Sequence, residues 1–554
     1  MKKKNLTFSA KRIVRRVRDA SALAFDTGIT MRVAAEARRR LSSLSLRCAG
    51  VFLFTLGIYS AVITLVKMLV LEQDPIVSIT ASVLCALSAV PLMLSSSTLG
   101  ESLVKTKTGR TILGFAGIRE ESVKVKEPFG RANIAFILGV AAGTLTFLAP
   151  TGAILMGVLL LILCGVVLTV PESAVMFASV FIPLGMDMPC AVLSWVGMIS
   201  FGIKYLRYKR YAVGFSHDKA AGVMLLSVVL GVLVSVGGAG SSSYIALLSM
   251  YFIASLSPSG RALGGKLMAT LVAAGGLSAA IFEVFAVIAF AAAKGKLSTA
   301  QAVDGIAVCD VNAMSLVACA LIPAAMFILI SGGALSRVTA FLCVASMTAF
   351  LVISQGYVYL VAAVVGTVAA MMFCNKHLGF LVISLGIFST VAWVWMGKDL
   401  MAISELIKSL LLRPEDMATQ SYDYFLFGEG LAGGFGHGGS FYMAVMSRLG
   451  FVGIAVLLAF GILLAIELIS LERKSKKSAS KVYKNACVPL CSVISLLVCG
   501  ISVNIWESSE GFLLFWILCG AAGACIAGGN RRADKLIEAD AEEKSKNAAG
   551  VIVK

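Results

Sequence analysis

Only a few residues of the sequence could act as an acid, a base or an anion ligand, and two of them stand in unusual places. The chain has three histidines, and His437 lies within the glycine-rich stretch 421–441. An imidazole there could serve as a general acid or base, could bind a diphosphate, or could be a simple exposed loop residue. Arg448 lies seven residues into the apolar run that begins at Phe441, about 10 Å deep at the rise of a helix. Because an unpaired charge at that depth is costly, Arg448 either faces a polar cavity or extends towards the headgroups.

Further polar residues stand inside or at the ends of other apolar runs. Glu283 lies in the middle of the run 267–293, and is either functional or a structural carboxyl group bonded to a neighbouring helix. Asn312 clusters with Asp304 and Asp310 at the start of the next run. These three residues could bind a sugar or cap the helix.

The remaining candidates for chemistry give no recognisable motif. His217 and His377 stand among lysines and arginines, which predicts surface residues. The thirteen cysteines contain no CxxC pair, and the sequence has no zinc motif, no glycine-rich nucleotide loop and no acidic pair at metal spacing. The sequence therefore predicts chemistry without a metal, a cofactor or ATP.

The elements that must position these residues are membrane helices. Hydrophobic residues make up 58% of the 554 residues and charged residues 14%, against about half and about a quarter in soluble domains. Apolar runs of about 20 residues recur between positions 49 and 528, which predicts an all-α, polytopic helical membrane protein. Because several runs are short, we expect about twelve to sixteen transmembrane helices and one long outer loop.

The basic residues predict the orientation of these helices. If successive runs define alternate sides, 41 of the 48 lysines and arginines fall on the side of the N-terminus and 5 on the other, with Lys67 and Arg448 inside runs. This asymmetry follows the positive-inside rule and predicts that both termini are cytoplasmic. It also accounts for the net charge of +18 without nucleic-acid binding.

The composition divides the chain into five segments. They are a basic cytoplasmic arm at 1–48, transmembrane helices at 49–397, an outer loop at 398–440, further transmembrane helices at 441–528 and a cytoplasmic tail at 529–554. The basic arm is either a solvated segment that fixes topology or a segment that lies on the anionic membrane lipids of the inner leaflet. The mixed charges of the tail predict disorder.

The outer loop differs from the short connections elsewhere. Apolar residues at helical spacing predict an amphipathic surface helix over 399–412, which ends before Pro414. The stretch 421–441 that follows contains seven glycines. Glycine at that density permits unusual backbone conformations and the close approach of a ligand, so we expect function in this loop.

Three stretches carry a resemblance to a known family. DVNAMSLVACALIPAAMFILI at 310–330 has an asparagine near its start and a proline midway, and VISQGYVYLVAAVVG at 352–366 has a Ser-Gln-Gly at its head. FLFGEGLAGGFGHGGSFYMAVMSRLGFVG at 425–453 contains a Gly-x-Gly loop, a histidine and a Leu-Gly-x-x-Gly. In these features the sequence resembles the O-antigen ligase/polymerase family of bacterial membrane glycosyltransferases. Gln355 stands where the family usually has arginine, and His437 stands two residues before the usual histidine position.

The resemblance implies a metal-independent glycosyltransferase of the bacterial cytoplasmic membrane. A lipid-linked oligosaccharide on undecaprenyl diphosphate would be the donor, and the transfer to an acceptor hydroxyl would take place on the outer face with inversion. His437 would be the catalytic residue that activates or orients the acceptor. Arg413 and Arg448 would hold the diphosphate, and Gln355 would contact it more weakly. The other residues implied for substrate binding are Glu429 and Asn312.

Two other classes of function stay open from the sequence. A multi-pass transporter or flippase of lipid-linked or small polar substrates would explain Glu283 and Lys67 inside apolar runs. However, no convincing repeat relates 49–300 to 300–528, and paired inverted repeats are common in transporters. A membrane scaffold without catalytic activity is the third possibility.

Overall fold

The protein divides into two compact units, each of which is described here by itself. Unit 1 comprises Met1–Ala174 and Ile199–Arg207, and unit 2 comprises Val175–Met198 and Tyr208–Lys554. The computed structural model describes residues 28–71, 76–106, 129–207, 216–234, 242–256, 258–292, 311–375, 379–384, 426–431, 439–477 and 484–552, together with His377 and a few single positions between 107 and 128. Every regular element in these ranges is a helix, which confirms the predicted all-α fold.

Unit 1 is a group of helices held together partly by buried hydroxyl groups. Its helices are α2 (Ile29–Leu41), α3 (Leu46–Leu71), α4 (Ile76–Met93), α5 (Leu99–Lys105), α8 (Ala132–Thr144), η1 (Leu145–Phe147) and α9 (Thr151–Thr169). The hydroxyl of Ser82 lies 2.9 Å from that of Ser60 and 3.1 Å from that of Thr151, and all three groups are buried. Such hydrogen bonds join α3, α4 and α9 where lipid offers no alternative partner.

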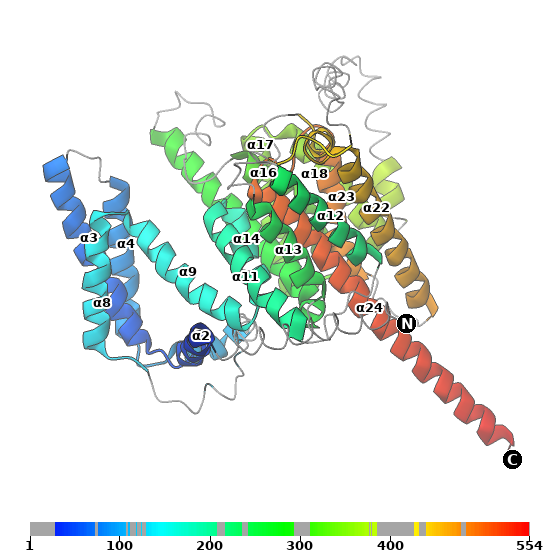
Figure 1. The fold of residues 1–554 in the computed structure, drawn as a ribbon, viewed down its shortest axis with the longest axis horizontal. Helices are drawn as coiled ribbons and strands as arrows, with labels where there is room; N and C mark the ends of the chain where they lie inside the picture. The colour runs from blue at the N-terminus through cyan, green and yellow to red at the C-terminus, as the bar shows by residue number, and fades with distance from the viewer. Residues whose placement is uncertain are drawn as a thin grey trace, which may run out of the picture. The chain divides into compact units, whose positions relative to one another are not determined.

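Unit 2 is built around its last helix. Its first helices are most of α10 (Glu172–Phe181), η2 (Ile182–Leu184) and the part of α11 (Asp187–Arg207) that precedes Ile199. They are followed by α12 (Ser216–Val234), α13 (Ser243–Leu256), α14 (Pro258–Ala292), α16 (Val311–Ser331), α17 (Ala334–Ile353), α18 (Tyr357–Cys374), α22 (Phe441–Lys477), α23 (Lys484–Cys499) and α24 (Ser509–Ile552). Figure 1 shows α24 in red, running through unit 2. In the apolar part of α24, 94% of residues are buried, against 22–33% in peripheral helices such as α17 and α22. A helix that is apolar on all sides belongs in such a core.

Aromatic side chains hold the N-terminal end of α24, at Ser509, in place. Trp506, Phe512 and Trp516 are fully buried, and the Trp506 ring lies 4.7 Å from the ring of Phe441 and 4.8 Å from that of Phe512. Rings of this size bury large apolar areas and pack edge to face. The cluster therefore joins the starts of α22 and α24 into one rigid end.

The helices follow the apolar runs of the sequence closely. Within the described residues, nine helices are long and apolar enough to span a membrane, against the twelve to sixteen predicted for the whole chain, and five shorter apolar helices accompany them. The run 338–374 breaks into α17 and α18 at Gln355, whose φ of 57° lies in the left-handed region. The predicted disorder of the tail is wrong, because α24 continues without interruption to Ile552. The Ala, Glu, Lys and Arg residues of this tail are also strong helix formers.

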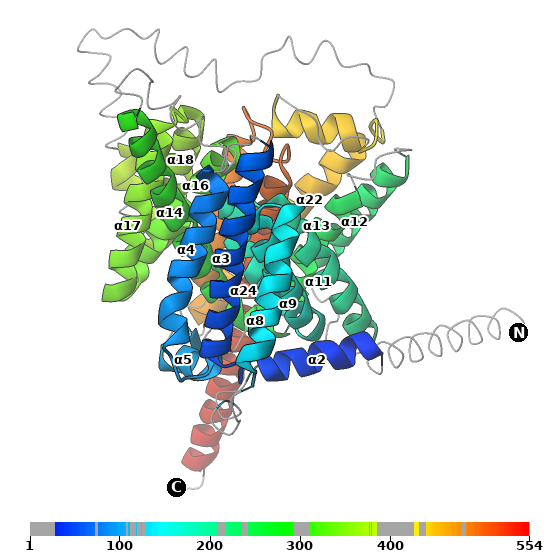
Figure 2. The ribbon, with the colours of Figure 1, turned by 90° about the vertical axis from the view of Figure 1, so that its left-hand side faces the viewer.

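One apolar run contains a sharp bend that hydropathy does not reveal. Gly450 has φ 67° and ψ −170° and divides α22 into two pieces. Figure 2 shows the first piece, residues 441–449, in yellow, lying across the direction of the second piece, which turns down through unit 2. Arg448 is therefore not about 10 Å along a straight transmembrane helix, as the sequence suggested, but at the bend itself.

Candidate functional site

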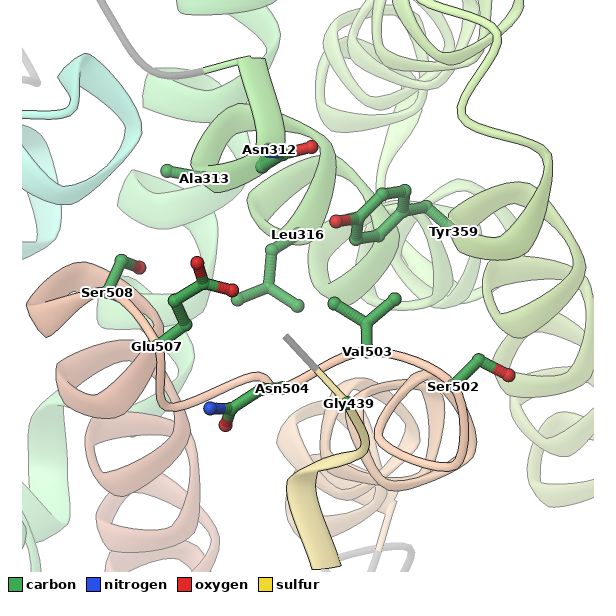
Figure 3. Close-up of a pocket in the computed structure, with 10 residues that line it drawn as sticks. All are labelled: Asn312, Ala313, Leu316, Tyr359, Gly439, Ser502, Val503, Asn504, Glu507 and Ser508. Carbon is green, nitrogen blue, oxygen red and sulfur yellow. The ribbon is translucent and has the colours of Figure 1, made fainter. Parts of the chain in front are cut away.

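A polar pocket opens at the end of unit 2 that the sequence predicts to face outside. Its volume is about 240 Å³. It lies between the starts of α16 and α18, the connection from α23 to α24, and Gly439, two residues before α22 (Figure 3). Polar side chains line most of it, and Leu316 and Val503 supply apolar surface. The polar lining residues are Asn312, Tyr359, Ser502, Asn504, Glu507 and Ser508.

The connection between α23 and α24 is a tight, well-bonded turn. The buried side-chain oxygen Oδ1 of Asn504 accepts a hydrogen bond from Trp506 N at 3.1 Å. The backbone carbonyl of Asn504 accepts a second hydrogen bond from Glu507 N at 3.2 Å. Ser508 Oγ accepts from Gly511 N at 3.1 Å in the first turn of α24, as helix-capping hydroxyl groups do. These bonds hold Glu507 and Ser508 at the wall of the pocket.

The end of the glycine-rich stretch is attached to the same turn. Gly439 lines the pocket with a φ of 76°, a conformation that favours glycine. Two residues later, Phe441 N donates to the carbonyls of Gly500 at 2.9 Å and Val503 at 3.2 Å, and its ring is fully buried. The glycine-rich stretch therefore ends at the wall of the pocket.

The bend in α22 is a second feature of this end, which we call the glycine elbow: residues 426–431 and 447–452. Glu429 N donates to Ser447 O at 2.8 Å, and Val452 N donates to Leu426 O at 3.3 Å. A Cβ atom on Gly450 would lie 2.4 Å from the carbonyl carbon and oxygen of Leu426. Only glycine allows the two backbone segments to approach this closely.

Arg448 and Glu429 form an ion pair on the glycine elbow. Arg448 Nη1 lies 3.7 Å from Glu429 Oε2, and the side chains are 25% and 47% exposed. A partly exposed guanidinium held beside a carboxylate keeps several N–H groups available for an anion. Two of the five residues that the resemblance implied for substrate binding, Arg448 and Glu429, are thus neighbours in space.

The other residues predicted for the site have different outcomes. Asn312 lines the pocket, where a residue that binds a sugar would have to lie. Gln355 is exposed at the break between α17 and α18 and is not among the pocket-lining residues. His437, Arg413 and the predicted surface helix 399–412 lie outside the described residues, so their roles stay predictions.

Sequence reasoning missed most of the pocket. Tyr359, Asn504 and Ser508 were not among the candidate residues. The available signal was the polar sequence Asn-Ile-Trp-Glu-Ser-Ser between two apolar runs. Hydropathy treats such a turn as a mere connection, and only the fold brings it to α16 and α18.

The prediction that His217 is a surface residue is wrong. Its side chain is fully buried at the opposite end of unit 2, where the ring Nδ1 hydrogen-bonds Glu467 Oε2 and Nε2 lies 3.6 Å from Asp218 Oδ1. Asp218 is 1% exposed and accepts hydrogen bonds from Tyr251 Oη at 2.9 Å and Ser255 Oγ at 2.8 Å. We call these five residues the buried polar cluster. It joins the start of α12 to α13 and α22.

The two charges that favoured a transporter have structural partners. Lys67 Nζ donates to Thr146 O at 2.9 Å and lies 5.4 Å from the centre of the Phe147 ring. Glu283 Oε1 accepts a hydrogen bond from Ser346 Oγ at 3.4 Å, and this bond joins α14 to α17. The structural interpretation of Glu283, a carboxyl group bonded to a neighbouring helix, agrees with this contact.

Within the part of the chain that the structure describes, no group of three or more His, Cys, Asp or Glu residues could hold a metal ion. Comparison of the sequence with known proteins adds no assignment, because no family model matches it and no curated protein matches it.

Proposed function

We propose that the protein is a membrane glycan ligase or polymerase of the O-antigen ligase type. It transfers a sugar chain from an undecaprenyl-diphosphate carrier to an acceptor on the outer face of the bacterial cytoplasmic membrane. The observation that carries this proposal is the shared location of the polar pocket and the glycine elbow. Both lie at the predicted outer end of unit 2, and the 441–449 piece of α22 connects them.

The proposed reaction needs no metal or cofactor. An acceptor hydroxyl attacks the anomeric carbon, the bond from that carbon to the diphosphate oxygen breaks, and the hydroxyl proton passes to a base. His437 is the proposed base, two positions before Gly439 in the sequence. Arg448 holds the leaving diphosphate together with Arg413, since a planar guanidinium fork matches phosphate oxygens.

Deletion of the gene, followed by profiling of surface polysaccharide and lipid-linked intermediates, tests this proposal. A ligase or polymerase predicts loss of a long or transferred glycan and accumulation of its undecaprenyl-diphosphate precursor. An unchanged glycan profile, with no accumulated precursor, would refute it. A plasmid copy with His437→Ala should fail to restore the profile although the protein is still inserted.

A transporter or flippase is the second candidate, and the buried polar cluster favours it. Ionisable side chains inside a membrane bundle often mark the path of an ion or substrate. Glu467 also lines a surface cavity of about 380 Å³ beside the cluster. A transporter predicts that Asp218→Asn abolishes export of the glycan precursor in a stable protein. Normal glycan from that variant would exclude a transport role for the cluster.

The basic arm is proposed to contact anionic lipid of the inner leaflet. Figure 2 shows α2 lying across the direction of α3 and α8 within unit 1, as a helix in the membrane interface would. The Arg40 guanidinium lies 4.6 Å from the centre of the Phe129 ring. Replacing Arg38, Arg39 and Arg40 by glutamine should reduce the anionic lipid that copurifies with the protein. An unchanged lipid ratio by mass spectrometry would contradict this contact.

A further inference from the structure

Helix α12 connects the buried polar cluster to the glycine elbow. Its first turn contains His217 and Asp218 of the cluster, and its last turn contains Gly231. The carbonyl of Gly231 accepts a hydrogen bond from Leu431 N of the glycine elbow at 2.9 Å. Between these ends α12 packs against α22, beside which it lies in Figure 2. A shift of α12 at its first turn therefore reaches the elbow at its last turn.

The Glu467 side chain of α22 caps the first turn of α12. The first N–H groups of a helix have no partner within the helix itself. Glu467 Oε1 accepts a hydrogen bond from Ser216 N at 2.8 Å, and Oε2 is hydrogen-bonded to Nδ1 of His217. The helix dipole also favours a carboxylate at this end. One side chain of α22 thus binds the first two residues of α12 through both of its oxygens.

The glycine elbow caps the last turn of α12. The carbonyl of Gly231 is among the last four of the helix, which have no partner within it, and Leu431 N supplies the hydrogen bond. A Cβ atom on Gly231 would lie 3.1 Å from the Leu449 side chain and 3.4 Å from the Leu431 side chain. The end of α12 therefore contacts both segments of the elbow.

The two helices are joined at both ends over equal lengths. Fifteen residues separate Ser216 from Gly231 in α12. Fifteen residues also separate Val452, which donates to Leu426 O on the elbow, from Glu467 in α22. Each span is about 22 Å, and a slip by one helical turn of about 5.4 Å would break the bonds at both ends. The bonds at the inner end therefore help to fix the register at the outer end.

The placement of Arg448 depends on this register. Glu429 N and Gly430 N donate to the carbonyls of Ser447 and Arg448 at 2.8 Å and 3.1 Å. Leu431, which bonds α12, is the next residue along the chain. The segment held by α12 thus also carries the Glu429 carboxylate and binds the backbone of Arg448.

We propose that Glu467 is a positioning residue for the glycine elbow and, through it, for Arg448. It fixes α12 against α22 at the inner end of unit 2 and thereby acts on the outer end, about 22 Å away. The fixed register is independent of the proposed function, and only its effect on glycan transfer rests on that function. The buried polar cluster then serves the outer site without passing an ion or substrate.

Cysteine cross-linking measures the register in the full-length protein in lipid nanodiscs. Gly231→Cys and Leu431→Cys are combined in a background without reactive native cysteines and oxidised with copper phenanthroline. Their backbones are hydrogen-bonded, so the two thiols lie close enough to form a disulfide. Glu467→Ala should lower the cross-linking rate of the folded protein by about 5-fold or more. Glu467→Gln keeps an acceptor for Ser216 N and should restore most of the rate.

Asp534→Asn is the matched control, because it removes an ion pair with Lys474 of α22 at the same end of unit 2. Its cross-linking rate should equal that of the parent cysteine pair. The cavity lined by Ser216 and Glu467 lets water solvate the freed N–H group, so Glu467→Ala should stay folded. If it does not, Ser216→Pro removes the same donor in a first turn that tolerates proline. An unchanged cross-linking rate in these variants would overturn the inference.

Glycan transfer is the second readout, measured with lipid-linked donor and normalised to folded protein. Glu467→Ala should lower kcat by about 10-fold and change the KM for the donor by less than about 3-fold, because misplaced groups slow the reaction more than they weaken binding. A loss of stability alone would not change kcat per folded protein. Slower cross-linking with an unchanged kcat would show that Glu467 does not position Arg448. If the unmodified protein transfers no glycan, the proposed function fails, and cross-linking alone decides whether Glu467 fixes the register.

Discussion

At the scale of single residues, the surroundings of a charge explain its position better than its depth in an apolar run. Lys67, Glu283 and Arg448 each looked costly in the sequence, and each has a partner in the structure. His217 looked ordinary and is the most enclosed histidine of the described chain. Its partner Glu467 is 250 positions away, and no local pattern can reveal such a pairing.

Arg448→Lys tests whether the guanidinium itself matters. Lysine keeps the positive charge but loses the planar fork, so we expect at least a 10-fold loss of glycan transfer, about 1.4 kcal/mol in transition-state binding. Transfer is measured in membranes with lipid-linked donor. Arg473→Lys, at the opposite end of α22, is the control and should keep full activity. Equal glycan transfer by both variants would show that Arg448 is not part of the site.

Asp218→Ala tests the buried polar cluster. It leaves the hydroxyls of Tyr251 and Ser255 without their acceptor in the interior, and each unsatisfied donor costs about 1–3 kcal/mol. We expect a lower unfolding temperature in detergent. Asp534→Asn breaks an exposed ion pair with Lys474 and should change stability by less than about 1 kcal/mol. If the two variants have the same unfolding temperature, the buried polar cluster does not stabilise unit 2.

At the scale of elements, the apolar runs predict helices well and their bends poorly. Apolar runs report which segments can enter lipid, because every backbone group there must be bonded within a helix. The run from Phe441 contains no proline and reads as one continuous span. Its bend depends on the left-handed φ of Gly450 and on contact with Leu426, and neither appears in a hydropathy pattern. The pocket likewise draws on segments far apart in the sequence.

Gly450→Ala tests the glycine elbow. The added Cβ would meet the backbone of Leu426 at 2.4 Å, and alanine disfavours a φ of 67°, so we expect a cost of about 1–3 kcal/mol. The Arg448–Glu429 pair should be displaced, and transfer activity should fall with stability. Gly461→Ala lies in the same helix with no atom within 4 Å of its Cβ and should be neutral or slightly stabilising. Unaltered activity in Gly450→Ala would show that the bend is dispensable.

At the scale of the whole molecule, the distribution of charge sets the expected orientation. The positive-inside rule places the pocket end outside and the end of α22 near Lys477 inside. Single cysteines at Ser421 and Ser478 test this in intact cells with a membrane-impermeant maleimide, in a background without reactive native cysteines. Ser421→Cys should be labelled, and Ser478→Cys only after lysis. The reverse labelling pattern would show that the predicted topology is inverted, and it would exclude a reaction on the outer face.

The enclosure of α24 has a consequence for how the protein is made. The helices that surround it in unit 2 precede it along the chain, yet its apolar part is 94% buried among them. At about 5–20 residues per second, translation from α11 to α24 takes on the order of half a minute. Throughout that interval the earlier helices must wait in the bilayer with an unfilled centre. Quality control during biogenesis should therefore act on unit 2 mainly before its final helix is released from the ribosome.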